Sequence, residues 1–386
     1  MKVLFLLHTS GNREGSSIAA LAIIKQLIIR GYEVMAVLPS AGELVGDLQK
    51  VGAKTEILYF NAATWPVHYN LKTALTVPKR LIVRLWANHF AERKLQRIVE
   101  LFQPNVIHSN TGVLRVGYYV AKKKRIPHVW HIRETEEGNH CYHYPSRAYQ
   151  KHLLESNAFN IAITRIVKDD YCLKDANTKV IYDGVFEQSY KPRPRMSKSN
   201  YFLSVGRVDV TKGFDWVVKA FLLVAEKYPD YELWIAGKDD LPFGKQLKKQ
   251  LNGIENSNRI KFLGIRNDVY ELMAQAQAVI VASHMEGFGF VTVEAMLNNT
   301  IVIGRNIGGT KEQFDNGLEL EGKEIGLRFD TIEELEEHIG NLCELGQKPY
   351  KEMIEAAQRV VRRLYTIESD VDKIEQVYKN VTKCKL

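Results

Sequence analysis

The feature that most constrains the fold is the alternation of short apolar runs with segments of helical periodicity. The run "KVLFLL" is followed by a polar turn that contains glycine, and then by "SIAALAIIKQLIIRGYEVMAVLP". In this second segment a helical pattern ends at Gly31 and another apolar run follows. A strand, a helix and a strand in this order predict a βαβ unit of an α/β protein.

The alternation continues in two blocks. The strand-like runs of the first block are "NVIHSN", "HVWHIRE", "FNIAIT" and "TKVIYDGV", and those of the second are "NYFLSVGRV", "YELWIAG", "RIKFLG", "AVIVAS" and "TIVIGR". Between the blocks, "KPRPRMSKSN" is polar and lacks periodicity, so we expect a linker at residues 191–199. The pattern predicts two doubly wound, Rossmann-like domains, residues 1–190 and 200–365, that face each other across a cleft.

The length and the C-terminal segment agree with this division. A chain of 386 residues that is 45% apolar and 25% charged exceeds what a single hydrophobic core usually serves. The last segment has helical periodicity with an expected break near Thr366. The final helix, about residues 366–386, could pack on either domain, including back on the first.

The cysteines and the hydropathy pattern favour a cytoplasmic protein. The four cysteines, Cys141, Cys172, Cys343 and Cys384, show neither C-x-x-C spacing nor clustering with histidines at ligand intervals. This pattern argues against a disulfide framework and a structural zinc site. The N-terminal apolar run is too short for a signal segment, and no run reaches the roughly 18 apolar residues of a membrane span.

Charge and motif spacing exclude several classes of ligand. The net charge of +8 favours acidic partners. Because zinc-finger spacing, an RNP-like motif and long Lys/Arg blocks are missing from the sequence, nucleic acid is disfavoured. A dinucleotide oxidoreductase is disfavoured because "LLHTSGNREGSS" is not G-x-G-x-x-G. His140, Cys141 and His143 lie close together, but no further residue is spaced to complete a metal site, so we expect no metal.

One stretch, "VASHMEGFGFVTVEAM", has the properties of a ligand site. A buried strand is expected to end at Ser283 and a helix to begin near Phe290. In doubly wound sheets, ligands bind beyond the carboxyl ends of strands, where loops lead into helices. The amides of Gly287 and Gly289, together with the positive end of the helix dipole, are suited to phosphate or sugar oxygens.

Two acids flank this glycine-rich turn and narrow the choice of ligand. Glu286 and Glu294 would repel a bare phosphate, so the ligand must also offer hydroxyl donors on either side of its charge. A nucleotide sugar does so, with hexose hydroxyls at one end and ribose hydroxyls at the other. The alternative is that the glycines only make a tight turn, and that Glu294 is an acid of the first helical turn.

Cations for a diphosphate are found in "VGRVDVTKGF". A strand ends at Gly206, and Arg207 and Lys212 lie on the loop that leads to the next helix. Both can point at a diphosphate in the same cleft. The alternative interpretation is two solvated loop charges.

Four motifs together resemble a known family. The segments "SVGRVDVTKGFDWVVKAF", "ELWIAGKDD", "VASHMEGFGFVTVEAM" and "GRNIGGTKE" follow one another as in the family 4 retaining glycosyltransferases. The resemblance covers the C-terminal half closely and the N-terminal half more loosely, through "RGYEVMAVLP" and "IAITRIVKDDY". It implies the GT-B fold, a nucleotide-sugar donor held mainly by the C-terminal domain, no metal or other cofactor, and retention of anomeric configuration.

The resemblance also implies roles for individual residues. Glu286 would contact the donor sugar and Glu294 the ribose, while Arg207 and Lys212 would contact the leaving diphosphate. The full catalytic set is Glu286, His131, Arg207 and Lys212, and the full donor-binding set is Glu294, Gly287, Phe288, Gly289, Phe290, Gly206 and Gly15.

The sequence departs from the family pattern in three places. Before the first helix, relatives commonly have paired glycines where this chain has "SGNREGSS", which leaves Gly15 as the phosphate contact. After Glu294 the usual Cys-Gly-x-Pro is replaced by "LNNTI". In "HIRE", His131 is expected at a strand end, pointing at the donor sugar, or else as a loop histidine bonded to backbone. Arg133 and Glu134 are either acceptor contacts or an ion pair.

A basic stretch with interleaved aromatic residues lies between residues 64 and 100. It contains Lys72, Lys79, Arg80, Arg84, Arg93, Lys94 and Arg97 together with Trp65, Tyr69, Leu81, Ile82, Leu85, Trp86 and Phe90. Such a stretch suits the surface of an anionic membrane, and in related enzymes this region faces the acceptor. The alternative is an ordinary helix with a buried apolar face and solvated charges.

These observations lead to one favoured hypothesis and two alternatives. The favoured one is a metal-independent, retaining glycosyltransferase that uses a UDP-sugar, or else a GDP-sugar, and a lipid-linked saccharide acceptor. It would work in the cytoplasm at the inner face of the cell membrane, in bacterial-type cell-surface polysaccharide biosynthesis such as that of capsule or O-antigen. The alternatives are a nucleotide-sugar epimerase and a non-catalytic protein that binds nucleotide sugars or polyanions.

Overall fold

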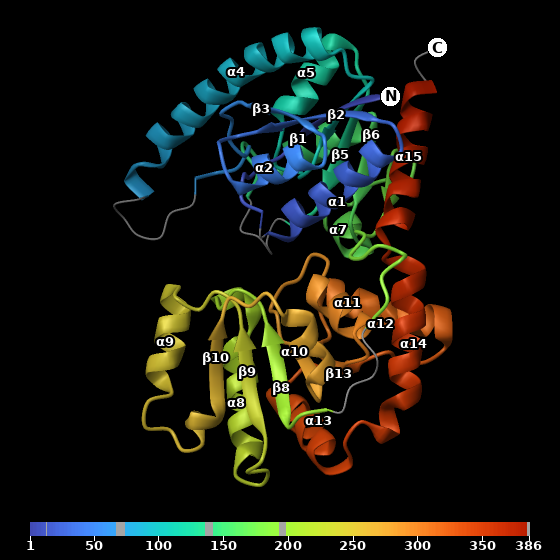
Figure 1. Ribbon diagram of the computed structural model, residues 1–386. Coiled ribbons are helices and arrows are strands. Elements are labelled where there is room, and N and C mark those ends of the chain that lie inside the picture. Colours follow the sequence, from blue (N-terminus) through green and yellow to red (C-terminus); the bar gives the residue numbers. More distant parts are fainter. Residues whose placement is uncertain (13, 67–73, 136–141, 193–197, 384–386) are drawn as a thin grey trace. The chain divides into compact units, whose positions relative to one another are not determined.

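The computed structural model describes residues 1–386 except 13, 67–73, 136–141, 193–197 and 384–386 (Figure 1). The chain forms two compact units. Unit 1 comprises Met1–Glu187 together with Thr366–Leu386, and unit 2 comprises Gln188–Tyr365. The final segment of the chain therefore returns to the unit that contains the N-terminus.

Unit 1 is built on a parallel sheet of seven strands in the order β3-β2-β1-β4-β5-β6-β7. The strands are β1 (Lys2–Leu6), β2 (Glu33–Leu38), β3 (Lys54–Ile57), β4 (Val106–Ser109), β5 (His128–Ile132), β6 (Phe159–Ala162) and β7 (Thr178–Val180). The helices are α1 (Gly15–Ile29), α2 (Glu43–Lys50), α4 (Val77–Phe102), α5 (Val116–Lys124), α6 (Arg147–Glu155), α7 (Arg165–Asp170) and α15 (Ile367–Lys383).

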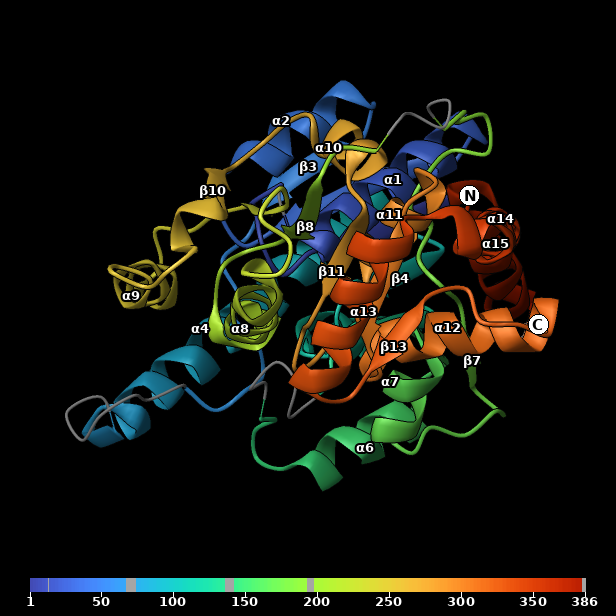
Figure 2. The same cartoon turned by 90° about the horizontal axis from the view of Figure 1, so that it is seen from below.

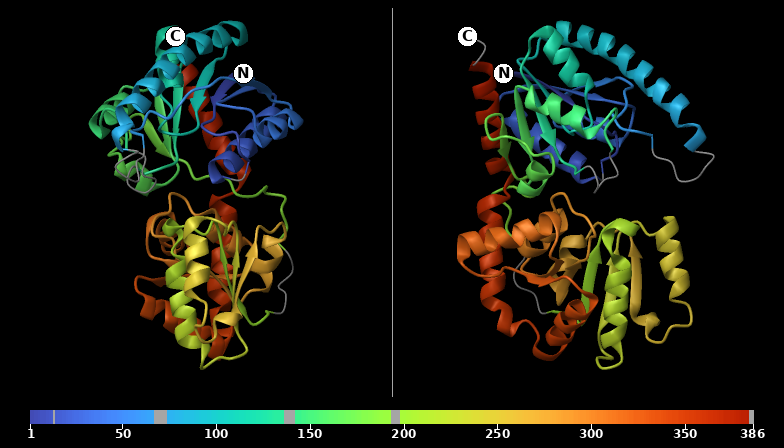
Figure 3. Two further views of the ribbon diagram at one scale, coloured as in Figure 1. Left: turned by 90° about the vertical axis from the view of Figure 1, so that its left-hand side faces the viewer. Right: turned by 180° about the vertical axis from the view of Figure 1, so that it is seen from behind.

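Both faces of this sheet are buried, which explains its continuous apolar strands. In β1, Val3 and Phe5 pack with α1, α2 and α15, whereas Leu4 and Leu6 pack with α4 and α5. Successive side chains of a strand point to opposite faces, so one apolar run serves two cores. Figure 3 shows α15 beside the sheet of unit 1 and α4 as the long helix at its outer side.

Unit 2 is built on a parallel sheet of six strands in the order β10-β9-β8-β11-β12-β13. The strands are β8 (Tyr201–Val205), β9 (Glu232–Ala236), β10 (Ile260–Gly264), β11 (Ala278–Val281), β12 (Ile301–Arg305) and β13 (Leu327–Phe329). The α-helices are α8 (Phe214–Ala225), α9 (Pro242–Gln250), α10 (Val269–Gln275), α11 (Phe290–Leu297), α12 (Gly308–Glu321), α13 (Ile332–Leu345) and α14 (Lys351–Leu364). Short 3-10 turns are η1 (Val210–Lys212), η2 (Ser257–Arg259) and η3 (Lys348–Tyr350).

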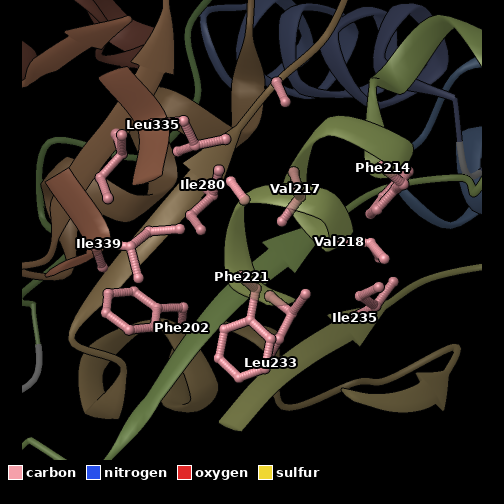
Figure 4. Close-up of a cluster of buried hydrophobic side chains, with 14 of the residues drawn as sticks. Phe202, Phe214, Val217, Val218, Phe221, Leu233, Ile235, Ile280, Leu335 and Ile339 are labelled. Atoms are coloured by element: carbon pink, nitrogen blue, oxygen red, sulfur yellow. The ribbon is translucent and has the colours of Figure 1, made fainter. Parts of the chain in front are cut away.

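One face of the sheet in unit 2 is covered by α8, α9 and α13, and α10, α11 and α12 lie on the other side (Figure 2). The side chains of Phe214, Val217 and Phe221 of α8 belong to one core cluster with Leu233 of β9 and Ile339 of α13, and Figure 4 shows Phe221 beside Leu233. These apolar positions recur at helical spacing, so α8 presents one stripe to the core.

The two parallel sheets confirm the predicted pair of doubly wound α/β domains. The expected helix break near Thr366 is present, because α14 ends at Leu364 and α15 begins at Ile367. Strands β3 and β13 were not predicted. All four residues of β3 are exposed or intermediate in burial, so the strand lacks a buried apolar run, and β13 has only three residues.

Candidate functional site

The loop between β11 and α11 places Glu286 against a cation from a distant part of the chain. Lys212 Nζ donates to Glu286 Oε2 at 2.7 Å, and Ser283 Oγ donates to the same oxygen at 3.1 Å. The side chains of Lys212 and Glu286 are 30% and 18% exposed. A carboxylate and an ammonium therefore meet at a partly open surface, where either can exchange its partner for a ligand.

Close backbone packing brings Lys212 to this loop. Gly213 adopts a left-handed conformation with φ of 65°, and a Cβ at this position would lie 2.0 Å from the carbonyl oxygen of Ala282. The His284 amide also donates to the Thr211 carbonyl at 2.8 Å. Only glycine permits this approach without strain. The "TKG" segment is thus held against the end of β11.

The N-terminus of α12 supports the loop from its other side. The Gly309 amide donates to the Glu286 carbonyl at 2.8 Å, and Gln313 Nε2 donates to the Phe288 carbonyl at 2.7 Å. A Cβ at Gly308 would lie 2.3 Å from the Glu286 carbonyl oxygen, and one at Gly309 would lie 2.1 Å from that of Phe288. The paired glycines of "GRNIGGTKE" therefore fix the backbone around Glu286.

Arg207 is positioned by a neighbouring acid. Its Nε donates to Asp209 Oδ2 at 2.6 Å, while the Thr211 amide and hydroxyl donate to Asp209 Oδ1. Although burial favours the neutral acid, these bonds hold the pKa of Asp209 below its ordinary value. The Arg207 side chain is 59% exposed, so its remaining guanidinium donors face solvent and are available to an anion.

Glu294 lies within α11 and is held by a tyrosine hydroxyl. Tyr270 of α10 donates to Glu294 Oε1 at 3.2 Å. Burial raises the pKa of Glu294 to about 6, against the opposing effect of the Tyr270 hydrogen bond. Glu294 therefore changes its protonation state near pH 6. Its carboxylate can still accept hydrogen bonds besides the one from Tyr270.

The other donor-site candidates present mainly backbone groups rather than polar side chains. Phe288 is 3% exposed and packs against Phe290 and Tyr365, so its side chain belongs to the interior. Gly289 is the N-cap of α11 with φ of 94°, which presents the first amides of the helix. Gly206 follows β8, with its amide donated to the Ala236 carbonyl.

Gly15, the remaining donor-site candidate, is the first residue of α1 in unit 1. That helix has Glu14 at its N-cap and no side-chain cap. The first backbone amides of a helix have no intrahelical acceptor, so they could donate hydrogen bonds to a phosphate.

The structure places His131 inside strand β5. It is the penultimate residue of β5, its side chain is fully buried, and Arg133 Nη2 lies 3.3 Å from its Nδ1. Burial, with the charge of Arg133 and the neighbouring His108, holds the pKa of His131 well below its ordinary value. Its Nε2 is buried and has no hydrogen-bond partner among the described residues, and the contact with the donor sugar stays a prediction.

Arg133 and Glu134 do not form the ion pair considered from the sequence. The Arg133 guanidinium pairs with Asp183 at 2.5 Å and donates to Asn110 at 3.1 Å. Glu134 instead accepts from the backbone amides of Val113 and Arg133 at 3.0 and 3.1 Å. The two residues are 8% and 5% exposed and belong to a buried polar cluster.

The helix α15 completes this cluster. The Tyr378 hydroxyl lies 2.6 Å from His108 Nδ1. Asp370 accepts a hydrogen bond from the Gly184 amide at 3.0 Å. Burial, reinforced by the nearby charge of Asp183, raises the pKa of Asp370 to about 8. The last helix therefore does more than cover apolar surface.

Metal and membrane features were searched among the described residues only. Within that part of the chain, no group of three His, Cys, Asp or Glu side chains is arranged to hold a metal ion. His140 and Cys141 lie outside the described residues, and His143 Nε2 is 2.9 Å from the Tyr171 hydroxyl. Outside the undescribed segments, no helix combines the length and the apolar character needed to cross a bilayer.

Several residues of the site were missed in the sequence. Tyr270, Ser283 and Gln313 all contact the two glutamates or their loop. Asp183 and Asp370 of unit 1 were also missed. The paired glycines of "IGG" after a strand were the one local signal for a close backbone approach, whereas the other contacts join residues far apart in the chain.

Two family models match the chain. The model described as Glycosyltransferase Family 4 matches residues 13–188, and the model described as Glycosyl transferases group 1 matches residues 186–360. The two matches meet where the two structural units meet in the sequence, after Glu187.

Two curated relatives align with parts of the chain. An uncharacterised glycosyltransferase of Methanocaldococcus jannaschii is 26% identical over 255 residues, which are 59% of this chain and 64% of that protein. The N-acetyl-alpha-D-glucosaminyl L-malate synthase of Bacillus anthracis is 28% identical over 167 residues, which are 43% of this chain and 42% of that enzyme. The alignments thus span less than two thirds of these relatives.

Solved structures resemble the whole chain. HepE of Anabaena in complex with UDP has a TM-score of 0.79 at 20% identity, with 98% of this chain and 100% of that chain covered. The same protein in complex with UDP-glucose has a TM-score of 0.77 at 22% identity and the same coverage. Likeness at this identity concerns the fold, and with the two parallel-sheet units it confirms the GT-B architecture.

Proposed function

The chain belongs to the glycosyltransferases of the family 4 type, and from this premise we propose that it transfers a sugar from a nucleoside diphosphate sugar to a saccharide acceptor. The reaction retains anomeric configuration and requires no metal ion. The favoured donor is a UDP-sugar, supported by the UDP and UDP-glucose in the HepE complexes; a GDP-sugar is the second choice.

The observation that carries this proposal is the Lys212–Glu286 ion pair beside the N-terminus of α11. Lys212 Nζ lies 2.7 Å from Glu286 Oε2. When donor binds, the ammonium turns to the diphosphate and Glu286 accepts a hydroxyl of the hexose. One rearrangement then supplies both halves of the ligand with a charge-assisted contact.

Transition-state stabilisation comes from the same groups. As the glycosidic bond breaks, negative charge grows on the leaving diphosphate, and Arg207, Lys212 and the amides at Gly289 stabilise it. Glu294 holds the ribose through its free acceptor sites. Glu286 is disfavoured as a covalent nucleophile, because two-carboxylate retaining chemistry needs a second acid about 5 Å away, and Glu294 is assigned to the ribose.

Replacing Arg207 and Lys212 together by Ala tests the assignment. Each removes a charge-assisted contact worth about 1.5–3 kcal/mol, so calorimetry should show weaker binding of both UDP and UDP-glucose. Lys245 and Lys249 are exposed cations of α9, and replacing both by Ala changes the net charge equally. Nucleotide affinity that stays at the parental value in the Arg207/Lys212 variant would refute the site.

The acceptor is proposed to be lipid-linked, in cell-surface polysaccharide biosynthesis of the capsule or O-antigen type. The protein works in the cytoplasm, bound peripherally at the inner face of the membrane. This proposal is supported by the first half of α4, where Ile82, Val83, Trp86 and Phe90 are 51–61% exposed on a helix that also carries Lys79 and Arg93. Lys72 and Tyr69 lie outside the described residues.

Replacing Lys79, Arg93 and Lys94 by Gln should weaken binding to anionic vesicles by about 1 kcal/mol per charge. Hydrolysis of UDP-glucose should be unchanged, because none of the proposed donor contacts lies on α4. The matched control replaces Lys219, Lys245 and Lys249, three exposed lysines of unit 2. If both triple variants sediment alike with vesicles, α4 is an ordinary surface helix.

The epimerase and the non-catalytic binding protein are not favoured by the family matches. Product analysis distinguishes them. An epimerase converts the donor without acceptor, and a binding protein leaves it intact, whereas a transferase releases nucleoside diphosphate when a saccharide acceptor is added.

A further inference from the structure

A cavity in unit 1 shares no residue with the proposed donor site. It has a volume of about 340 Å³ and lies between α4, α5, the segment 62–64 and the start of α6. Its lining combines Arg84, Glu92 and Arg115 with the apolar side chains of Leu81 and Leu85. Three tyrosines, Tyr119, Tyr144 and Tyr149, complete the wall.

Hydrogen bonds hold this cavity open. Asn88 of α4 accepts from the Asn61 amide at 2.7 Å and donates to the Asn61 carbonyl at 3.1 Å. Arg84 donates to the Thr64 carbonyl at 3.1 Å, and the Tyr144 amide donates to the Ala63 carbonyl at 3.0 Å. The helix and the segments below it are thereby fixed, so a ligand meets a preformed site.

Arg115 is the lining side chain that has a hydrogen-bond donor without a partner in the described part of the chain. It is 5% exposed, its Nε donates to Gln150 at 2.7 Å, and its Nη1 donates to the Tyr144 carbonyl. Its Nη2 is buried and has no hydrogen-bond partner among the described residues. A buried donor without a partner is costly, and a ligand oxygen would remove that cost.

The charge around Arg115 also favours an anion. Its bonded partners are an amide oxygen and a carbonyl, and its guanidinium lies 5.1 Å from the Tyr149 ring centroid. Burial lowers the pKa of Arg115 and of Arg84, which shows that neither cation is fully compensated. Glu92 supplies a carboxyl group to the same lining, against two guanidinium groups, and burial raises its pKa.

The apolar part of the cavity continues onto the outside of α4. Leu81 and Leu85 line the cavity, and Leu85 is 43% exposed. Ile82 and Trp86, one helical turn apart, are 56% and 61% exposed on the neighbouring stripe. The site thus has a cationic interior and an apolar exit.

We propose that this cavity binds a phosphorylated amphiphile, with the phosphate at Arg115 and Arg84 and the apolar chain leaving over Leu85 and Trp86. The inference rests on the proposed function in one respect, because it identifies this ligand with the phosphate-bearing lipid carrier of the acceptor. The recognition chemistry itself depends only on unit 1. A guanidinium matches phosphate geometry, and the exposed stripe accepts the chain.

Calorimetry of the full chain with three probes tests the proposal: decyl phosphate, decyl glucoside and inorganic phosphate, all below micellar concentrations. Decyl phosphate should bind about tenfold or more tightly than either of the others, because only it engages both parts of the site. Equal affinity for inorganic phosphate would reduce the cavity to a free-phosphate site. Equal affinity for decyl glucoside would leave the cations without a role. Either result overturns the proposal.

Variants locate the binding. Arg115→Gln and Arg84→Gln should each weaken decyl phosphate binding about tenfold, and Leu85→Glu should do the same by placing a carboxylate at the exit. Leu101→Glu is the matched control, because Leu101 is 88% exposed on the same helix and remote in sequence from the lining residues. Arg115 is buried, so Arg84→Gln and Leu85→Glu decide the matter if Arg115→Gln unfolds. Parental affinity in both would refute the site.

UDP-glucose binding and hydrolysis, measured in the same samples, separate this inference from the proposed function. Loss of decyl phosphate binding in Leu85→Glu with intact donor hydrolysis is the expected result. A parent that binds decyl phosphate but never uses UDP-glucose or another nucleotide sugar would overturn the transferase and leave the cavity standing. A parent protein that turns over the donor without binding decyl phosphate would overturn the cavity proposal and leave the proposed transferase activity standing.

Discussion

The two units pair their charged side chains in opposite ways. In unit 2, Lys212 and Glu286 are 30% and 18% exposed at 2.7 Å. In unit 1, Arg133 and Asp183 are 5% and 1% exposed at 2.5 Å, within a cluster that α15 completes. The two ion pairs therefore have different roles. The Lys212–Glu286 pair can separate to bind a ligand, whereas the Arg133–Asp183 pair is part of the buried structure of unit 1.

The difference follows from solvation. An exposed ion pair gains little because water screens it, so separating its members to admit a diphosphate costs about 1 kcal/mol or less. A buried pair has already lost the solvation of both charges, and removing one partner leaves the other stranded at a cost of about 3–5 kcal/mol. Burial, rather than residue type, separates the ligand site from the structural cluster.

The largest expected effect is on stability. Replacing Arg133 by Met leaves Asp183 buried without its cation, and we expect unit 1 to lose about 3–5 kcal/mol of unfolding free energy. Urea denaturation monitored by circular dichroism measures this loss. The Lys212→Met variant is the contrasting control, since it should cost about 1 kcal/mol or less.

A double variant sharpens this prediction. Adding Asp183→Asn to Arg133→Met removes the stranded charge, so the double variant should be more stable than Arg133→Met alone. A single variant as stable as the parent would show that the buried pair does not stabilise the fold.

The next effect concerns the two glutamates of unit 2. Glu294→Gln removes a charged acceptor for ribose hydroxyls and should weaken UDP and UDP-glucose alike, by about 1.5–3 kcal/mol. Glu286→Gln should spare UDP affinity but lower kcat about tenfold or more, because its partner is the hexose, where geometry changes as the bond breaks. Calorimetry and steady-state kinetics separate the two. Equal losses of UDP affinity, or a full kcat in Glu286→Gln, would refute the division of roles.

Much of unit 2 could be predicted because its signals are local. The strands end where apolar runs end, and the α11 start at Phe290 follows from the glycine turn before it. The strand before this turn ends at Val281, two residues earlier than expected at Ser283. The proximity of Lys212 and Glu286 could be predicted because both residues follow strands, β8 and β11, that are neighbours in a parallel sheet.

Unit 1 was harder to predict because its cluster joins distant segments. Asp370 meets Gly184 across 186 positions of sequence, and His108 meets Tyr378 across 270. In addition, "HVWHIRE" predicts that His131 lies near a strand end, but only the structure shows that its ring is fully buried. Sequence periodicity shows which face is apolar but not which polar groups share that face.

The open site should show its pH dependence in binding. Burial raises the pKa of Glu294 to about 6 in the free protein, and only the carboxylate form is a charged acceptor for the ribose. UDP affinity should therefore be constant above pH 7 and fall about tenfold for each pH unit well below 6. Calorimetry between pH 5 and pH 8 measures this. Glu294→Gln should flatten the profile, and an unchanged slope in that variant would assign the titration to another group.

The closed cluster should show its pH dependence in stability. Burial raises the pKa of Asp370 from 3.8 to about 8. Between these values the folded protein holds a proton that the unfolded chain has released, so the stability present below 3.8 is progressively lost as pH rises toward 8. The slope of the unfolding free energy against pH is at most about 1.4 kcal/mol per pH unit, and it is shared with Asp183.

The Asp370→Asn variant keeps the bond to the Gly184 amide and stays neutral, so its urea midpoint should change less between pH 5 and pH 8 than that of the parent. An equal change in both proteins would show that α15 does not bring a titrating group into the cluster, and the contrast between a site that titrates in binding and one that titrates in folding would fail.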